Sequence, residues 1–262
     1  MTAALITGAS TGLGRELAGL FARDGVDVVA VSSERSTAQL DELAEELRAR
    51  YGVRVETVTM DLAAPGAGAD LVSRVDELGV DITYLVNNAG VGILGLKIQE
   101  SDPVAVSKMV QLNVVTLTEL TTMYAARMVR AGRGAILNIS SVAAYVIPHG
   151  LEAGYAASKA YVRSFSESVA DDLRGTGVTC THLAPGPTRT EFGRTAGVGD
   201  WSRLDRYMMD AAPVAAAGYA AMRTGQVAVM PGFGPKVMRV ASTVSPSRRL
   251  TALVSGYFVS RH

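Results

Sequence analysis

Short apolar runs alternate with amphipathic stretches along most of this chain. Strand-length apolar runs lie at 4–6, 27–31, 54–59, 84–87, 135–140, 178–183 and 227–230. Between them the apolar spacing is helical, and over 36–50 it places Leu40, Leu43, Ala44 and Leu47 on one face. Strands that alternate with helices predict an α/β fold, in which a doubly wound parallel sheet of about seven strands is covered on both faces.

Composition favours one folded domain and excludes several kinds of partner. The chain has 262 residues, of which 48% are hydrophobic and 19% charged, so we expect a single domain over 1–262. A net charge of zero gives no support to nucleic-acid binding. No apolar run reaches the roughly 18 residues of a membrane span, and the first strand follows Met1 too closely for a signal peptide. We expect a cytoplasmic protein, with its only cysteine, Cys180, in the core.

A glycine-rich loop follows the first strand. It reads Thr7-Gly8-Ala9-Ser10-Thr11-Gly12-Leu13-Gly14 and leads into a helix expected over 13–24. Glycines at these positions allow a tight turn and let a pyrophosphate approach the amide groups and the positive end of the helix. Glycine is frequent in this chain, at 27 residues, so the strand before the loop and the helix after it carry most of the weight.

Tyr155 and Lys159 are four residues apart in the run GYAASKAY, and a helix there would place both side chains on one face. Free tyrosine has a pKa near ~10 and exchanges protons poorly at neutral pH. A cation held close favours the phenolate and lowers that pKa. The pair is therefore a candidate acid–base device.

Further polar motifs follow the ends of the expected strands, where a doubly wound sheet places its ligands. They are Asn87-Asn88-Ala89-Gly90, Asn113 on the next helix, Ser140-Ser141, and Pro185-Gly186-Pro187-Thr188. With the glycine loop and the Tyr155 motif, this ordered set resembles the short-chain dehydrogenase/reductase family from about residue 3 to 190. The stretch 227–232 further resembles an NADP-preferring subgroup of that family. The resemblance implies a Rossmann-like sheet flanked by helices on both faces.

The resemblance implies four catalytic residues, Asn113, Ser141, Tyr155 and Lys159. Tyr155 would exchange a proton with the substrate oxygen, and Lys159 would lower the pKa of Tyr155 and hold the nicotinamide ribose. Ser141 would hydrogen-bond the substrate oxygen, and Asn113 would position a water in a proton relay. Ser141 precedes Tyr155 by fourteen residues, about one more than the family pattern, so Ser140 is the alternative. Strand alternation allows only one of the two hydroxyls to face the site.

The resemblance also implies a nicotinamide cofactor along the ligand edge. The residues expected to contact it are Gly8, Ser10, Thr11, Gly12, Leu13, Gly14, Ser32, Ser33, Arg35, Asp61, Leu62, Asn88, Ala89, Gly90, Tyr155, Lys159, Pro185, Gly186, Thr188 and Thr190. No carboxylate stands at Ser32 to accept from an adenosine 2′-hydroxyl. Two hydroxyls and Arg35 would accommodate a phosphate, which favours NADP(H) although Glu34 adds an unfavourable charge. NAD(H) is the alternative.

Several of these residues also have structural interpretations. Asn87 and Asn88 could tie adjacent strands together, and Asp61 could cap a helix. His149 is expected in a pocket wall or at the surface, and His182 in the core. No metal-binding cluster is visible in the sequence.

The segment 190–212 mixes Phe192, Trp201, Tyr207 and methionines with glycines, and we expect it to form an apolar substrate lid. The same residues could instead pack on the core or on a second subunit. Over about 235–260, apolar residues at helical spacing predict a helical extension that packs on the core or a partner subunit, with a membrane surface as the other possibility. The family habit suggests a homodimer or a homotetramer.

These observations predict an NADP(H)-dependent oxidoreductase that interconverts a carbonyl and a secondary alcohol on a lipophilic small molecule. An NAD-dependent alcohol dehydrogenase is one alternative. A cofactor-binding scaffold with a non-redox role, such as cyclisation, isomerisation or regulation, is the other, and the four catalytic candidates argue against it.

Overall fold

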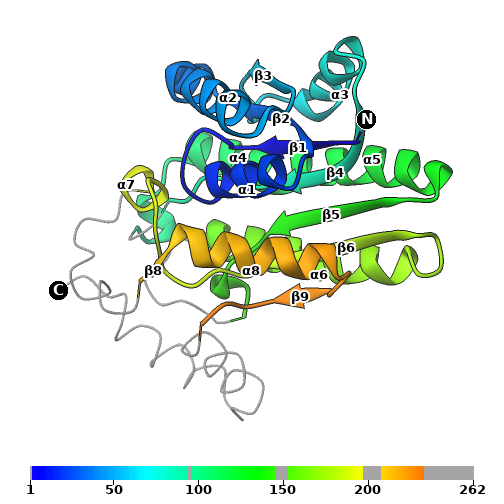
Figure 1. Ribbon diagram of the computed structural model, residues 1–262. Helices are drawn as coiled ribbons and strands as arrows, with labels where there is room; N and C mark the ends of the chain where they lie inside the picture. The colour runs from blue at the N-terminus through cyan, green and yellow to red at the C-terminus, as the bar shows by residue number, and fades with distance from the viewer. Residues whose placement is uncertain (1, 94–95, 146–152, 197–207, 233–262) are drawn as a thin grey trace.

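The computed structural model describes residues 2–93, 96–145, 153–196 and 208–232 (Figure 1). In these ranges seven strands form one parallel sheet in the order β3-β2-β1-β4-β5-β6-β9. The strands are β1 (Thr2–Thr7), β2 (Asp27–Ser32), β3 (Val55–Thr59), β4 (Asp81–Asn87), β5 (Gly134–Ile139), β6 (Val178–Leu183) and β9 (Ala228–Val229). The predicted doubly wound sheet is confirmed, and each predicted strand is found with small differences at its ends. A short second pair, β7 (Thr188–Arg189) and β8 (Met209–Asp210), was not predicted.

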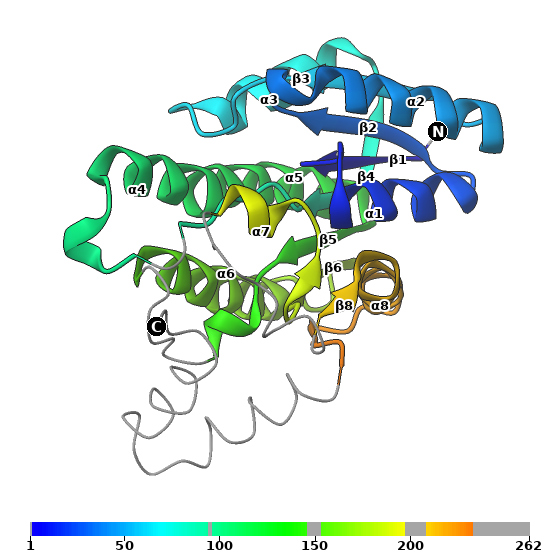
Figure 2. The ribbon, with the colours of Figure 1, turned by 90° about the vertical axis from the view of Figure 1, so that its left-hand side faces the viewer.

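Helices cover both faces of the sheet (Figure 2). Helices α1 (Gly12–Arg23), α2 (Thr37–Tyr51) and α8 (Ala211–Arg223) pack on one face, and α3 (Ala67–Glu77), α5 (Leu117–Ala131) and α6 (Ala153–Asp172) on the other. Strand β1 shows why both faces are apolar: Ala4 and Ile6 contribute to the first core, while Ala3 and Leu5 contribute to the second.

Shorter elements connect this framework. They are α4 (Pro103–Val110), α7 (Phe192–Thr195), the 3₁₀ turns η1 (Glu34–Ser36), η2 (Ile98–Glu100) and η4 (Val142–Ala144), and the π-helical turn η3 (Gln111–Thr116). Because the strands are parallel, the segments that follow β1, β2, β4, β5 and β6 all lie at one edge of the sheet. That edge carries the motifs singled out in the sequence.

A buried polar network holds the middle of the sheet to the second helical layer. Nδ2 of Asn87 donates to Oδ1 of Asn138 at 2.9 Å and to Oγ1 of Thr121 at 3.0 Å, and Nδ2 of Asn138 donates to Oγ of Ser166 at 2.9 Å. These bonds join β4, β5, α5 and α6 immediately behind the motif edge. Asn87 therefore ties adjacent strands, as its structural interpretation predicted, and Cys180 lies buried beside this network.

Candidate active site

The glycine-rich loop folds tightly between β1 and α1. Gly8 and Gly12 have φ angles of +67° and +55°, a conformation that favours glycine. A Cβ on Gly14 would lie only 2.1 Å from the carbonyl oxygen of Gly8. Helix α1 begins at Gly12, its first turn has no acidic residue, and the side chain of Thr11 makes no capping hydrogen bond. The amide groups at this helix end are therefore suited to a phosphate anion, which fits the cofactor that the loop predicts.

Asn88 clamps this loop to the end of β4. Its Nδ2 donates to the carbonyl oxygens of Thr7 and Gly8, each at 2.9 Å, and its backbone amide donates to Oγ1 of Thr7 at 3.0 Å. The amide of Ala89 donates to the same hydroxyl at 3.0 Å. Asn88 and Ala89 thus hold the glycine-rich loop against the end of β4, the framework role that the structural interpretation gave to Asn88.

The structure separates the three residues proposed to accommodate a phosphate after β2. Ser32 is buried, and its hydroxyl donates to Oγ of Ser10 at 2.9 Å. Ser33 and Arg35 are exposed, and so is Glu34. Ser32 therefore serves to hold the glycine loop against β2, and only Ser33 and Arg35 are accessible to a phosphate.

Asp61 and Leu62 lie at the end of β3, in the expected place. Oδ1 of Asp61 accepts from the amide of Ala63 at 2.9 Å, a contact within the turn after β3. Asp61 does not cap a helix, as its structural interpretation proposed, because α3 begins only at Ala67 and its N-cap residue is Gly66. The carbonyl oxygen of Leu62 accepts from Oγ1 of Thr116 at 2.8 Å. This second bond connects the end of β3 to η3.

Tyr155 and Ser141 meet at the edge of the sheet, whereas Ser140 points elsewhere. The side chain of Ser141 is hydrogen-bonded to Tyr155, and its Oγ also accepts from the amide of Ala143 at 3.1 Å. Oγ of Ser140 donates to the carbonyl oxygen of Lys159 at 2.9 Å. Both serines follow the last residue of β5, Ile139, and their hydroxyls have separate partners. The geometry brings Ser141 to the phenol and gives Ser140 a role in holding α6.

Lys159 lies one helical turn beyond Tyr155 and is buried. Its Nζ donates to the carbonyl oxygen of Ile139 at 3.0 Å and lies 5.9 Å from the centroid of the Tyr155 ring. A Cβ on Gly90 would lie 3.4 Å from Nζ and 3.1 Å from Oδ1 of Asn113. Gly90 therefore lets the lysine and the asparagine approach the same backbone.

Asn113 lies in the π-helical turn η3 instead of in a regular helix as expected. Its Oδ1 accepts from the amide of Val91 at 3.0 Å, and its Nδ2 donates to the carbonyl oxygen of Val91 at 2.9 Å and to Oγ of Ser158 at 3.2 Å. Wider π turns frequently occur at functional sites. Here the turn aims a buried carboxamide at the loop after β4 and brings Asn113 beside the tyrosine–lysine pair.

The ionisation of Tyr155 differs from the expectation that Lys159 lowers its pKa. Burial raises the pKa of Tyr155 to about 12, and the hydrogen bond from Ser141 opposes this rise. Burial also lowers the pKa of Lys159 to about 8. The physical reason is that the low-dielectric surroundings disfavour both charged forms, while Nζ is directed toward a backbone carbonyl.

The segment after β6 borders the site from the other side. The carbonyl oxygen of Pro185 accepts from the amide of Val142 at 2.9 Å, which fixes the turn that follows Ser141. Oγ1 of Thr188 donates to the carbonyl oxygen of Gly186 at 2.9 Å. A Cβ on Gly12 would lie 3.0 Å from Cγ2 of Thr190. The expected cofactor residues of this segment therefore lie against both the glycine loop and the serine turn.

An apolar cluster surrounds Tyr155. It comprises Met109, Ala143, Tyr155 and Ala196, with Ile93, Val106 and Phe192 packed against it. Of these, only Tyr155 and Phe192 were singled out from the sequence. The others come from four separate segments, and no local pattern distinguishes them from core residues. Of the predicted lid, 197–207 lies outside the described residues, as do His149 and the predicted extension at 235–260.

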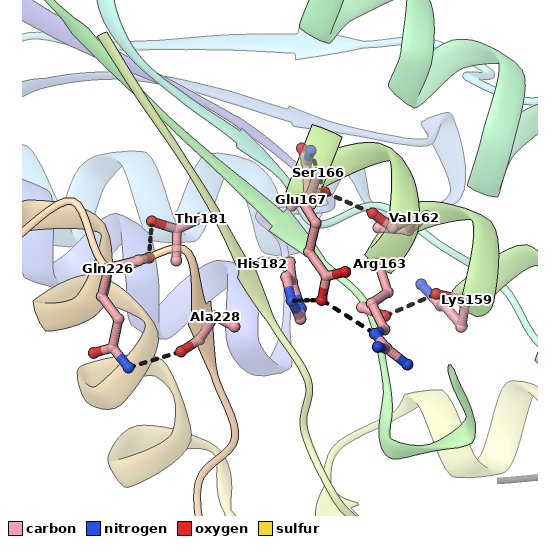
Figure 3. A network of polar contacts seen from close by, with 11 residues as sticks. Lys159, Val162, Arg163, Ser166, Glu167, Thr181, His182, Gln226 and Ala228 are labelled. Carbon is pink, nitrogen blue, oxygen red and sulfur yellow. Dashed lines mark hydrogen bonds and ion pairs between the residues drawn. The ribbon is translucent and has the colours of Figure 1, made fainter. Parts of the chain in front are cut away.

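A second set of contacts joins α6 to β6 (Figure 3). His182 is fully buried, and its Nε2 lies 3.3 Å from Oε1 of Glu167, which also accepts from Nε of Arg163 at 3.1 Å. The Arg163 guanidinium lies 4.2 Å from the centroid of the Tyr145 ring. The predicted core position of His182 is confirmed, and its carboxylate neighbour on α6 is a feature that the sequence did not reveal.

Two features are missing from the described ranges, 2–93, 96–145, 153–196 and 208–232. Within them no group of three His, Cys, Asp or Glu side chains is arranged to hold a metal ion. Nor does any helix there have the length and apolar character needed to cross a bilayer.

Comparison with known proteins defines the family. The model of the short chain dehydrogenase family matches residues 2–199, and the chain belongs to this family of oxidoreductases. It is 35% identical over 213 residues to sulfoacetaldehyde reductase 2 of Chromohalobacter salexigens. The matched region covers 81% of this chain and 82% of that protein.

Solved structures agree with this assignment. A short-chain dehydrogenase from Sphingobium yanoikuyae in complex with NADPH is 30% identical, with a TM-score of 0.81 over 98% of this chain and 93% of the other. The bulky-bulky ketone specific alcohol dehydrogenase from Comamonas testosteroni is 27% identical, with a TM-score of 0.76 over 98% and 91% of the two chains.

Proposed function

We propose that this protein is an NADP(H)-dependent oxidoreductase that interconverts a ketone and a secondary alcohol on a lipophilic small molecule. The observation that carries the proposal is the hydrogen bond between Ser141 and Tyr155 at the sheet edge, with Lys159 one helical turn away. Asn113 and the glycine loop lie at the same edge.

Each of the four catalytic candidates has a place in the proposed reaction. In the reduction direction, the phenol of Tyr155 donates its proton to the substrate oxygen as that oxygen gains negative charge. Ser141 donates a hydrogen bond to the same oxygen. The nicotinamide, when bound, supplies the hydride. Lys159 stabilises the phenolate that remains on Tyr155, and Asn113 holds the loop after β4 through both backbone groups of Val91.

The phosphate-bearing cofactor is favoured by charge at the end of β2. Ser33 and Arg35 are exposed there, and no carboxylate stands at Ser32. The relative from Sphingobium yanoikuyae, which was solved with NADPH, supports the same choice. Two observations favour an NAD-linked enzyme as the second candidate: the hydroxyl of Ser32 is bonded to Ser10, and Glu34 is exposed beside Arg35.

A lipophilic substrate is favoured by the apolar cluster around Tyr155. The likeness to an alcohol dehydrogenase that is specific for bulky-bulky ketones agrees with this class. The likeness to a sulfoacetaldehyde reductase points instead to a small anionic aldehyde, so both classes belong in the assay. The single domain, the cytoplasmic location and the homodimer or homotetramer stay predictions from the sequence.

The test combines cofactor binding with one substitution. Fluorescence titrations with NADPH and NADH measure cofactor preference without knowledge of the substrate, and turnover is then measured with a panel of ketones and with sulfoacetaldehyde. Tyr155→Phe should bind NADPH as the wild type does and lose nearly all turnover, because only the proton donor is removed. Substantial turnover by this variant would contradict the proposal. Equal affinity for NADH would move the cofactor assignment to the second candidate.

A further inference from the structure

The ring of Phe192 lies over the ring of the proposed proton donor, Tyr155. The two centroids are 5.7 Å apart and the ring planes are tilted by 41°. Tyr155 belongs to α6 and Phe192 to α7, so two separate segments build this contact. Only 7% of the surface of Tyr155 is exposed. A substrate oxygen therefore has little access to Tyr155 while the Phe192 ring is in this position.

Gly92 provides the space in which the Phe192 ring lies. A Cβ on Gly92 would lie 2.8 Å from Cζ of Phe192, 3.4 Å from its Cε1 and 3.4 Å from Cδ2 of Tyr155. The backbone of Gly92 does not have the positive φ that would itself require glycine. The backbone at Gly92 can therefore accept a side chain. A Cβ there would take up space between Phe192 and Tyr155.

The backbone on each side of Phe192 is anchored. Before it, Thr190 contacts Gly12 of the glycine loop, and β7 pairs with β8, where the amide of Met209 donates to the carbonyl oxygen of Pro187 at 3.0 Å. After it, Ala196 is buried in the apolar cluster. With both flanks held, the substrate is accommodated most readily by a movement of the Phe192 side chain.

We propose that Phe192 is a specificity-determining residue. Its ring occupies the place over Tyr155 that the large apolar group of the bound ketone takes, and Gly92 sets the room available. This inference rests on the proposed carbonyl–alcohol function and names its substrate class: ketones with an aryl or similarly large apolar group next to the carbonyl. The walls available to such a group are Ile93, Val106, Met109 and Ala143, all apolar.

The experiment measures NADPH oxidation with acetophenone, acetone and sulfoacetaldehyde. Its readout is the ratio of kcat/KM for acetophenone to that for acetone, because a general loss of activity cancels in a ratio. Phe192→Ala removes the ring that competes with the aryl group and should raise the ratio about 10-fold. Gly92→Ala places a methyl group in the same space and should lower it about 10-fold.

Two further variants complete the design. Gly19→Ala is the matched control: Gly19 lies on α1 with no heavy atom within 4 Å of a Cβ, so the ratio should stay at the wild-type value. Phe192→Leu should raise the ratio as Phe192→Ala does, but by less. It takes the place of Phe192→Ala if that variant does not fold. NADPH titration shows which variants retain the cofactor site.

The outcomes separate this inference from the function on which it rests. Unchanged ratios in the Phe192 and Gly92 variants, together with normal wild-type turnover, would overturn the role of Phe192 alone. A wild-type preference for sulfoacetaldehyde over acetophenone would overturn the substrate class and leave the carbonyl–alcohol reaction in place. If the wild type binds NADPH but does not oxidise it with any of the carbonyl compounds, both proposals are contradicted.

Discussion

Replacing Lys159 by methionine is expected to make the protein more stable at pH 7 although it removes a catalytic candidate. Lys159 is only 5% exposed, and burial lowers its pKa from the ordinary 10.5 to about 8. The folded state therefore binds the lysine proton less tightly than the unfolded state does. The resulting destabilisation is complete below pH 8 and disappears as the pH rises through 10.5.

The magnitude follows from this difference in pKa. A fall from 10.5 to about 8 corresponds to about 3 kcal/mol of lost stability at pH 7. Methionine has a similar length but cannot donate to the carbonyl oxygen of Ile139, and the loss of that 3.0 Å hydrogen bond costs about 1 kcal/mol. The net gain is about 2 kcal/mol, which corresponds to a rise in Tm of about 4 °C for a chain of this size.

Urea unfolding of the wild type and Lys159→Met at pH 7 and pH 10.5 measures this gain. At pH 10.5 the contribution of the charge falls below about 1 kcal/mol, so the variant should lose its advantage. Lys108→Met is the control, because Lys108 is exposed on α4 and should leave the free energy of unfolding unchanged at both pH values. Equal or lower stability of Lys159→Met at pH 7, or a gain that persists at pH 10.5, would show that the buried charge of Lys159 does not destabilise the fold.

Three further predictions concern the glycine loop, its clamp and the tyrosine. Gly14→Ala places a Cβ 2.1 Å from a backbone oxygen and should cost about 2 kcal/mol, whereas Gly19→Ala on the same helix should gain about 0.5 kcal/mol; equal urea midpoints for the two variants would contradict this. Asn88→Ala breaks the two Nδ2 bonds to the loop and should cost about 2 kcal/mol and weaken NADPH binding, so an unchanged NADPH titration would argue against the clamp. Burial raises the pKa of Tyr155 to about 12, so the stability that this group contributes is complete below about pH 10 and is lost as the pH rises toward 12. The ultraviolet titration curve of the wild type minus that of Tyr155→Phe should show one phenol that ionises above pH 11. Ionisation near pH 10 would be inconsistent with the burial of Tyr155.

The alternation of strands and helices was readable from the sequence because each signal is local. A strand such as Val178–Leu183 is a run of neighbouring residues, and the apolar face of α2 repeats within one helix. The short pair β7 and β8 was missed because two-residue strands carry no periodicity. The π turn at Asn113 was missed for a related reason: a single wide turn is too short to show a period of its own.

The candidate residues of the site could be named from the sequence alone. The four-residue spacing of Tyr155 and Lys159, the glycine loop and the order of motifs after the strands are properties of neighbouring residues, and parallel strands bring their ends to one edge of a sheet. Which hydroxyl meets the phenol depends on the folded chain, since Ser140 and Ser141 differ by one position and have different partners.

The pKa values of Tyr155 and Lys159, and the packing of Phe192 over Tyr155, also depend on the folded chain. The pKa of a buried group depends on the dielectric of everything packed around it, and for Tyr155 that includes side chains from the loop after β4, from α4, from η4 and from α7. Gly92 and Phe192 are 100 residues apart, and the contact between them exists only because the fold brings both over Tyr155. Long-range packing sets the local environment of a side chain, and no pattern of neighbouring residues encodes it.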